Sequence, residues 1–92
     1  MLIIEFTPQM KRDVKKMKKR GKDLEKLTKT LAILASEKVL PQQYRDHPLK
    51  GSLHDFRECH IEPNWLLMYQ IFEDKLILSC TATGTHDDLF KE

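Results

Sequence analysis

Apolar residues in the first part of the chain are spaced first as in a strand and then as in a helix. Residues 2–6 form a short apolar run rich in β-branched side chains, which predicts a strand. Apolar residues then recur every three or four positions over residues 8–20, which predicts a helix. Thr7 is a typical N-cap for this helix, and Gly21 is a typical stop signal.

A second helical pattern follows directly. Asp23 can cap a helix over residues 24–35, in which leucines form a stripe that small and branched residues broaden towards a buried surface. We expect the two helices to form a hairpin that packs on a sheet. Residues 38–55 contain two prolines and a glycine without a sustained period, so they predict a long connecting loop.

Three apolar runs in the second half are close enough to form an antiparallel meander. Alternation in the first of them places Glu58 and His60 on one face and Cys59 on the other. The predicted strands cover residues 56–61, 65–72 and 75–83, with turns at 62–64 and 73–74.

The C-terminus and the length of the chain complete the predicted fold. Thr85 and Asp88 have capping-box-like spacing, which predicts a short helical turn. A chain of 92 residues can build one hydrophobic core, so we expect a single domain over residues 1–92. The predicted class is α+β, in the order β-α-α-β-β-β, with a small antiparallel sheet packed by the N-terminal two-helix hairpin.

Composition is that of an ordinary globular protein with a charged surface, at 40% hydrophobic and 33% charged residues. No apolar run reaches the roughly 20 residues of a membrane span, and the N-terminus lacks the features of a signal peptide. We therefore expect a cytoplasmic protein. Cys59 and Cys80 lack C-x-x-C spacing, and we expect buried apolar fillers rather than a disulfide.

The formal net charge of +2 hides a strong asymmetry. Residues 11–29 hold ten of the sixteen lysines and arginines against three acidic residues. Such a run suits a polyanion such as nucleic acid, and a solvated helix face explains it as well. The candidate RNA- or ribosome-binding residues are Lys11, Arg12, Lys15, Lys16, Lys18, Lys19, Arg20, Lys22, Lys50 and Arg57.

The four histidines all lie in the second half, in or beside loops and strand ends. A ribonuclease without a metal must remove a proton from a 2′-hydroxyl, protonate the leaving 5′-oxygen and stabilise charge on the phosphate. Histidines suit the first two tasks. Taken singly, each histidine fits a surface or hydrogen-bonded structural role better than a catalytic one. A zinc site from His47, Cys59, His60 and His86 is a competing interpretation, although no local ligand motif supports it.

Three patterns in the second half are specific when they are combined. Residues 44–51, 56–69 and 84–90 carry D-H-P-L-x-G, R-x-x-H-x-x-P and G-T-H-x-x-L-F. The combination resembles the YafQ branch of the RelE superfamily of bacterial toxin ribonucleases, whereas the N-terminal half matches only in its order of elements. The resemblance implies a RelE-like toxin that cuts mRNA in the A site of the 70S ribosome through the 2′-hydroxyl. It also implies a cognate antitoxin protein as partner and no metal or other cofactor.

The resemblance also implies roles for individual residues. His47, His60 and His86 fall on the family's active-site histidines. We expect His86 to be the general acid, and either His47 or His60 to be the base or the phosphate ligand. His54 has no counterpart, and we expect it at the surface. The catalytic candidates are His47, Glu58, His60, His86 and Phe90, of which Phe90 falls on an aromatic position near the scissile nucleotide.

Two positions depart from the family pattern. Asn64 stands where the family commonly has Asp, and an amide cannot act as a base. Ala82 stands where the family commonly has Arg, and in a regular strand it would share its facing with Cys80 and Gly84. The departures support an alternative, a basic module that binds ribosomal RNA or an antitoxin without cutting. A metal-dependent nuclease is the third interpretation.

Overall fold

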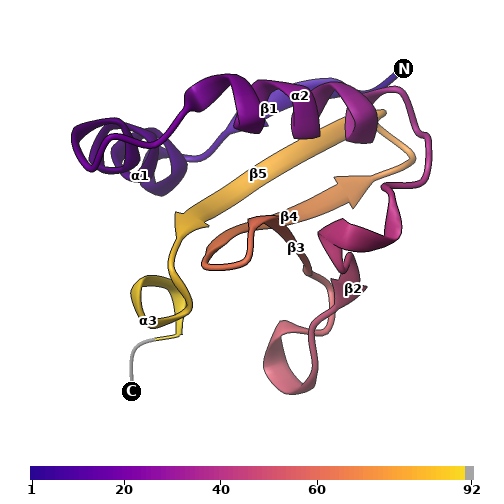
Figure 1. Ribbon diagram of the computed structural model, residues 1–92. Coiled ribbons are helices and arrows are strands. Elements are labelled where there is room, and N and C mark those ends of the chain that lie inside the picture. Colours follow the sequence, from indigo (N-terminus) through magenta and orange to yellow (C-terminus); the bar gives the residue numbers. More distant parts are fainter. Residues whose placement is uncertain (91–92) are drawn as a thin grey trace.

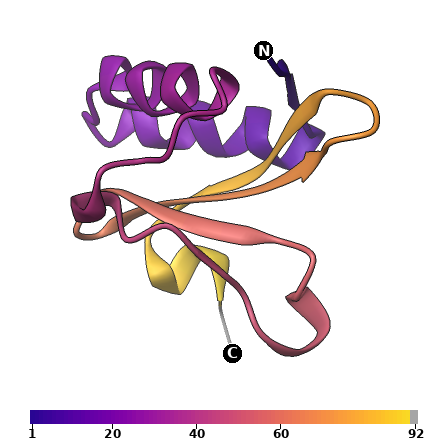
Figure 2. The ribbon, with the colours of Figure 1, turned by 90° about the vertical axis from the view of Figure 1, so that its right-hand side faces the viewer.

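A mixed five-stranded sheet separates two helical layers. The strands are β1 (Ile3–Phe6), β2 (His47–Pro48), β3 (Arg57–Glu62), β4 (Trp65–Phe72) and β5 (Ile77–Gly84). The helices are α1 (Pro8–Lys19), α2 (Leu24–Ala35) and α3 (His86–Leu89), with 3-10 turns η1 (Gln42–Tyr44) and η2 (Gly51–Leu53). The computed structural model describes residues 1–90, and its strand order is β1-β5-β4-β3-β2. The α1–α2 hairpin covers one face of the sheet, and α3 lies on the other (Figures 1 and 2).

Both long helices begin where the sequence predicts. The hydroxyl of Thr7 accepts a hydrogen bond from the Met10 N–H at 3.0 Å and donates one to the carbonyl of Thr81 at 2.7 Å. The cap therefore ties α1 to β5 as well as starting the helix. Asp23 caps α2 by accepting a hydrogen bond from a backbone N–H of its first turn at 3.0 Å. None of the helices in residues 1–90 has both the length and the apolar composition of a membrane span.

The hydrophobic core lies between the helix hairpin and the covered face of the sheet. Its buried members include Met10, Met17, Leu27, Leu31, Leu34, Trp65, Leu67, Tyr69 and Leu78. Cys59 and Cys80 belong to the same cluster as free thiols, and burial raises the pKa of each to about 12. The two cysteines are therefore protonated apolar fillers, as predicted.

The sheet differs from the prediction in the direction of one strand and in the number of strands. β1 pairs with β5 in parallel, so the sheet is not wholly antiparallel. An apolar run predicts that a strand exists, whereas its partner depends on how distant parts of the chain meet. The predicted loop over residues 38–55 contains β2, which pairs with β3. The α+β class is confirmed, and the other element bounds lie within two residues of prediction.

A bulge at Thr81 decides which side chains of β5 face the helices. Tyr69 pairs with Cys80 and Met68 pairs with Ala82, so β5 has one extra residue between two consecutive residues of β4. Cys80 therefore faces the core beside Tyr69, and Ala82 faces the opposite side beside Met68. The prediction that position 82 shares its facing with Cys80 is wrong, because a period of two does not continue through a bulge.

Candidate active site

The face of the sheet opposite the helix hairpin, here called the open face, collects side chains from four strands. His47 of β2 pairs with Glu58 of β3, Glu58 pairs with Met68 of β4, and Met68 pairs with Ala82 of β5. Paired residues point to the same face, so these four side chains form one row across the sheet. A second row on the same face consists of His60, Leu66 and Gly84.

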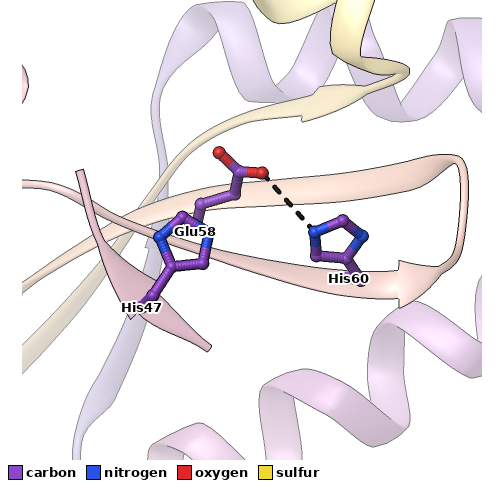
Figure 3. Close-up of side chains that lie close together, drawn as sticks. All are labelled: His47, Glu58 and His60. Atoms are coloured by element: carbon purple, nitrogen blue, oxygen red, sulfur yellow. Dashed lines mark ion pairs between the residues drawn. The ribbon is translucent and has the colours of Figure 1, made fainter. Parts of the chain in front are cut away.

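Three side chains of these rows form a cluster, here called the histidine cluster (Figure 3). It consists of His47, Glu58 and His60, and one side-chain nitrogen or oxygen of each lies within 4.8 Å of the others. The Nε2 atom of His60 is 3.7 Å from Oε1 of Glu58. Glu58 is only 6% exposed, whereas His47 is open to solvent. A nearly buried carboxylate thus lies beside two imidazoles that a ligand can reach.

Backbone carbonyls orient both imidazole rings. The Nδ1 atom of His47 is 3.0 Å from the carbonyl oxygen of Pro48, and that of His60 is 3.3 Å from the carbonyl oxygen of Pro63. A carbonyl can only accept, so each Nδ1 carries a proton and the neutral ring has its lone pair at Nε2. Either Nε2 can therefore accept a proton. Glu58 can stabilise the positive charge that results on His60.

His86 reaches the open face from the far end of the second row. It is the first residue of α3 and is exposed. Gly84, two residues earlier, is separated from His60 by two strand spacings, about 10 Å. The rings of His86 and Phe90 lie together, with centroids 5.0 Å apart. The structure therefore places His86 and Phe90 at the rim of the open face, and Figure 2 shows α3 on this side.

Asp88 fastens α3 to the rest of the molecule. Its carboxylate accepts hydrogen bonds from the Thr85 N–H at 2.9 Å and from the two terminal nitrogens of Arg20 at 2.7 and 3.2 Å. Arg20 and Thr85 hold the pKa of Asp88 well below its usual range. Gly84 is required here because a Cβ at this position would lie 2.8 Å from the Cβ of Asp88. The spacing of residues 85 and 88 predicted the capping box, but no local signal predicts Arg20.

A second arginine–aspartate pair holds β2 from the covered side of the sheet. Arg57 donates from Nε and Nη2 to Asp46, each at 3.3 Å, and the hydroxyl of Tyr69 also donates to Asp46. Burial and the bond to Asp46 raise the pKa of Tyr69, which therefore remains a donor. Asp46 directly precedes His47, so this network positions His47 from behind. Arg57, a candidate RNA contact, faces away from the histidine cluster.

The other candidate residues are distributed over the surface. Lys22 donates to Glu62 at 2.8 Å, so this predicted RNA contact is engaged in an ion pair. Asn64 is exposed in the turn between β3 and β4, and His54 is exposed beside Asp55, away from the histidine cluster. The exposed candidate cations on α1 and before η2 are Lys11, Arg12, Lys15, Lys16, Lys18, Lys19 and Lys50.

The histidine cluster has the donor atoms of a metal site. Two imidazole nitrogens and one carboxylate oxygen suit zinc and other divalent transition metals. The zinc interpretation of the sequence included two further residues that the structure does not bring into this group. Cys59 faces the core, and His86 lies at the rim. His47, Glu58 and His60 are thus the residues that could hold an ion.

Solved structures of small bacterial toxins share this arrangement of sheet and helices. The crystal structure of a metal-bound toxin from Helicobacter pylori superposes with a TM-score of 0.93 at 46% sequence identity, over 98% of this chain and 100% of that chain. The chain matched in the crystal structure of the Escherichia coli DinJ–YafQ complex has a TM-score of 0.89 at 38% identity, over 98% of this chain and 99% of that chain.

The sequence comparison defines the family more narrowly. Residues 2–91 match the family described as the bacterial toxin of type II toxin-antitoxin systems, YafQ. The mRNA interferase toxin YafQ of Escherichia coli K12 is 44% identical over 88 residues, which is 95% of this chain and 94% of that protein. This chain belongs to the YafQ toxin family, and the resemblance found in its sequence is confirmed.

Proposed function

We propose that this chain is an endoribonuclease that cuts mRNA in the ribosomal A site and inhibits translation as the toxin of a toxin–antitoxin pair. The histidine cluster on the open face, with His86 at the rim of the same face, is the observation that carries the proposal. The relative from Escherichia coli that is named an mRNA interferase toxin supports the choice of substrate. The chain would then act in the bacterial cytoplasm, where mRNA and ribosomes are found.

The proposed reaction is a transesterification without a metal. His60 accepts the proton of the RNA 2′-hydroxyl at Nε2 while the 2′-oxygen bonds to phosphorus. The bond from phosphorus to the 5′-oxygen breaks, and His86 gives a proton to that oxygen. The products are a 2′,3′-cyclic phosphate and a 5′-hydroxyl.

Neighbouring side chains assist this reaction. Glu58, at 3.7 Å from Nε2 of His60, is too distant to occupy that nitrogen with a hydrogen bond but close enough to stabilise the imidazolium. His47 stands on the exposed side of the cluster and can bind the phosphate when protonated. The ring of Phe90 offers a surface on which a base can stack.

The exposed lysines of α1 would dock the toxin on ribosomal RNA. Contacts between lysine and phosphate release counterions, so docking should weaken steeply as salt rises. Replacing Lys15, Lys18 and Lys19 together by Gln should weaken binding and flatten that salt dependence. Unchanged affinity and slope would show that the basic surface is only solvated. The antitoxin would be a small protein that binds this chain; YafQ of Escherichia coli forms a toxin–antitoxin complex with DinJ.

Two other candidate functions have specific support. Ala82 and Asn64, at positions where the family commonly has Arg and Asp, favour a basic module that binds RNA or an antitoxin without cutting. The donor set of the histidine cluster and the metal-bound relative from Helicobacter pylori favour a metal-dependent nuclease. In that case a divalent ion on the two imidazoles would activate the nucleophile.

One experiment separates the three candidates. Programmed ribosomes are incubated with the protein, with and without a chelator that removes transition metals but leaves Mg²⁺, and the RNA ends are mapped. Cleavage to cyclic phosphate ends that resists the chelator is the expected result. Ribosome binding without cleavage would identify the binding module, and activity lost with the chelator would identify the metal enzyme. Efficient cutting of naked RNA at low protein concentration would contradict ribosome dependence.

A further inference from the structure

A cavity of about 320 Å³ lies directly beside His60. One wall consists of the end of η1 and the next residue, with Gln43, Tyr44 and Arg45. The other wall is the end of β3 and its turn, residues 61–63. The edge of β3 is uncovered by β2 at this point, because β2 pairs with residues 57 and 58. His60 therefore belongs both to the histidine cluster and to this cavity.

The cavity carries a positive charge that no residue of the described chain neutralises. Arg45 is exposed, and its guanidinium makes no hydrogen bond or ion pair within residues 1–90. The acidic side chain in the wall, Glu62, binds Lys22 at 2.8 Å and Lys26 at 2.7 Å through its two oxygens. The two lysines hold the pKa of Glu62 below its usual range and more than balance its charge. The cavity therefore favours an anion.

The backbone conformation of Arg45 fixes its position beside the cavity. Its φ of 48° and ψ of 43° lie in the left-handed region, which is uncommon for arginine, and its N–H donates to the carbonyl of Gln42 at 3.0 Å. This conformation ends η1 and turns the chain towards β2. Arg45 lines the cavity as a result, and the next residue, Asp46, meets Tyr69 on the covered side of the sheet. The same turn thus places Arg45 and, two residues on, His47.

We propose that this cavity is a subsite for the RNA nucleotide next to the scissile phosphate. Arg45 binds the phosphate of that nucleotide, because a guanidinium matches a phosphate with two parallel hydrogen bonds. The volume is at the small end of ligand sites, so it suits one nucleotide. The amide of Gln43 both donates and accepts, so it can distinguish base edges, while Tyr44 and Pro63 supply apolar surface. The proposal rests on the ribonuclease function proposed above.

The first test measures binding without cleavage. The antitoxin-free protein is titrated with a trinucleotide that carries 2′-O-methyl groups, and the NMR signals of the Arg45 side chain and of residues 61–63 are followed. These signals should shift, and the Arg45→Asn variant should bind roughly tenfold to hundredfold more weakly, as expected for a hydrogen bond to a charged group. Asparagine tolerates the left-handed conformation, so the variant should keep its melting temperature. Arg45→Lys should retain part of the affinity.

A matched control removes the same charge elsewhere. Lys75 lies in the turn between β4 and β5, at the opposite end of β4 from the cavity. Lys75→Gln should bind the trinucleotide as the parent does. Equal affinity in the parent and Arg45→Asn would overturn the subsite. Shifts at Arg45 with an acidic peptide but none with the trinucleotide would also overturn it, by showing that a protein carboxylate fills the cavity.

The second test measures cleavage on programmed ribosomes in the same preparations. Arg45→Asn should raise KM with kcat nearly unchanged, because its phosphate contact is present before and during the reaction. Gln43→Ala should change the ranking of cleaved codons, whereas Arg45→Asn should lower cleavage of all codons alike. Binding that depends on Arg45 in a parent that cuts nothing would keep the subsite and contradict the ribonuclease. Cleavage that both substitutions leave unchanged would support the ribonuclease and contradict the subsite.

Discussion

β2 and α3 are two short segments that each bring a candidate catalytic histidine to the open face, and an aspartate bound by an arginine holds each of them. Directly before β2 the aspartate is Asp46, bound by Arg57 and by Tyr69, which is 1% exposed. On α3 it is Asp88, bound by Arg20. The two arginines are similarly exposed, at 38% for Arg20 and 39% for Arg57, so the buried tyrosine is what distinguishes the β2 pair. The first group, here called the β2 anchor, consists of Asp46, Arg57 and Tyr69 and belongs to the sheet. The second group, here called the α3 anchor, consists of Asp88 and Arg20 and ties α3 to the basic helix hairpin.

The two sides of the site therefore depend on different parts of the molecule. His47 is tied to the strands that carry Glu58 and His60, so the cluster behaves as part of the sheet. His86 is tied to the end of α1, the surface proposed to meet ribosomal RNA. Damage to the β2 anchor should therefore lower the stability of the fold first. Damage to the α3 anchor should lower the reaction rate first.

The largest effect is expected from the histidine of α3. His86→Gln removes the proposed acid and should lower kcat by about 10²–10⁴, with ribosome binding and melting temperature close to those of the parent. Single-turnover cleavage on programmed ribosomes measures the rate. His54→Gln, at an exposed histidine outside the cluster, is the matched control and should change neither quantity. A large fall in the melting temperature of His86→Gln alone would identify His86 as a structural residue.

Ala82→Arg tests whether the α3 side of the site lacks a cation. Residue 82 faces the open side in the same row as Glu58 but is only 8% exposed, so an arginine that fits here has to extend past its neighbours towards the phosphate. By analogy with a single oxyanion donor, it should raise the chemical rate by up to about 10²–10³. Single-turnover rates and a melting curve are measured together. A folded variant that cuts no faster would show that another residue stabilises the phosphate charge.

The β2 anchor should dominate stability. Tyr69→Phe removes a buried hydrogen bond to a carboxylate, which should lower the free energy of unfolding by roughly 1.5–3 kcal/mol while Arg57 still holds Asp46. Chemical denaturation at pH 7 measures this change. Tyr44→Phe removes a hydroxyl that bonds to no residue within 1–90, so its stability should match that of the parent. Equal losses in both variants would contradict the role of Asp46.

The smallest effect on stability is expected at Asp88. Arg20 and Thr85 lower its pKa in the folded state below the unfolded value of about 3.9. The carboxylate therefore stabilises the fold above about pH 4, and this contribution is lost as the pH falls through the folded pKa. Asp88→Asn should be slightly less stable than the parent at pH 7, with a difference that shrinks in acid. Thermal melts over a pH series measure this difference.

The reaction rate distinguishes an anchor from an ordinary surface pair. Asp88→Asn should lower kcat by up to about tenfold, below the roughly 10²-fold cost of a full misplacement, because Thr85 still caps α3. Asp87→Asn changes the neighbouring exposed carboxylate and is the control. Identical rates in the two variants would show that the Arg20 contact does not position His86.

Local features of the fold could be predicted because their signals lie within a few residues of one another. Thr7, Asp23 and Thr85 cap helices in the structure as their spacing predicts. The alternation along β3 also placed Glu58 and His60 on one face correctly, because that strand is regular where they lie. The bulge at Thr81 has no such signal, and the facing of Ala82 could not be obtained from counting.

Contacts between distant parts of the chain could not be predicted from the sequence. Arg20 and Asp88 are 68 positions apart. Each fits a local pattern, the basic helix for Arg20 and the capping box for Asp88, and neither pattern gives a reason to pair them. The sequence around Arg20 indicates only one more cation of a basic helix. The sequence around Asp46 also contains no signal that this residue contacts Tyr69 on the covered side of the sheet. The candidate histidines could be chosen from the sequence, whereas the anchors that hold them depend on the assembled sheet.

The place of β5 in the sheet has a consequence for synthesis of the protein. Of the five strands in residues 1–90, β5 is synthesised last, yet it lies between β1 and β4. A nascent chain that ends before residue 77 has no partner for β1 and lacks Leu78 and Cys80, on which the helices pack. Folding therefore waits for long-range pairing between the two ends of the chain. A ribosome that translates this mRNA therefore holds an unassembled site at least until it has translated β5.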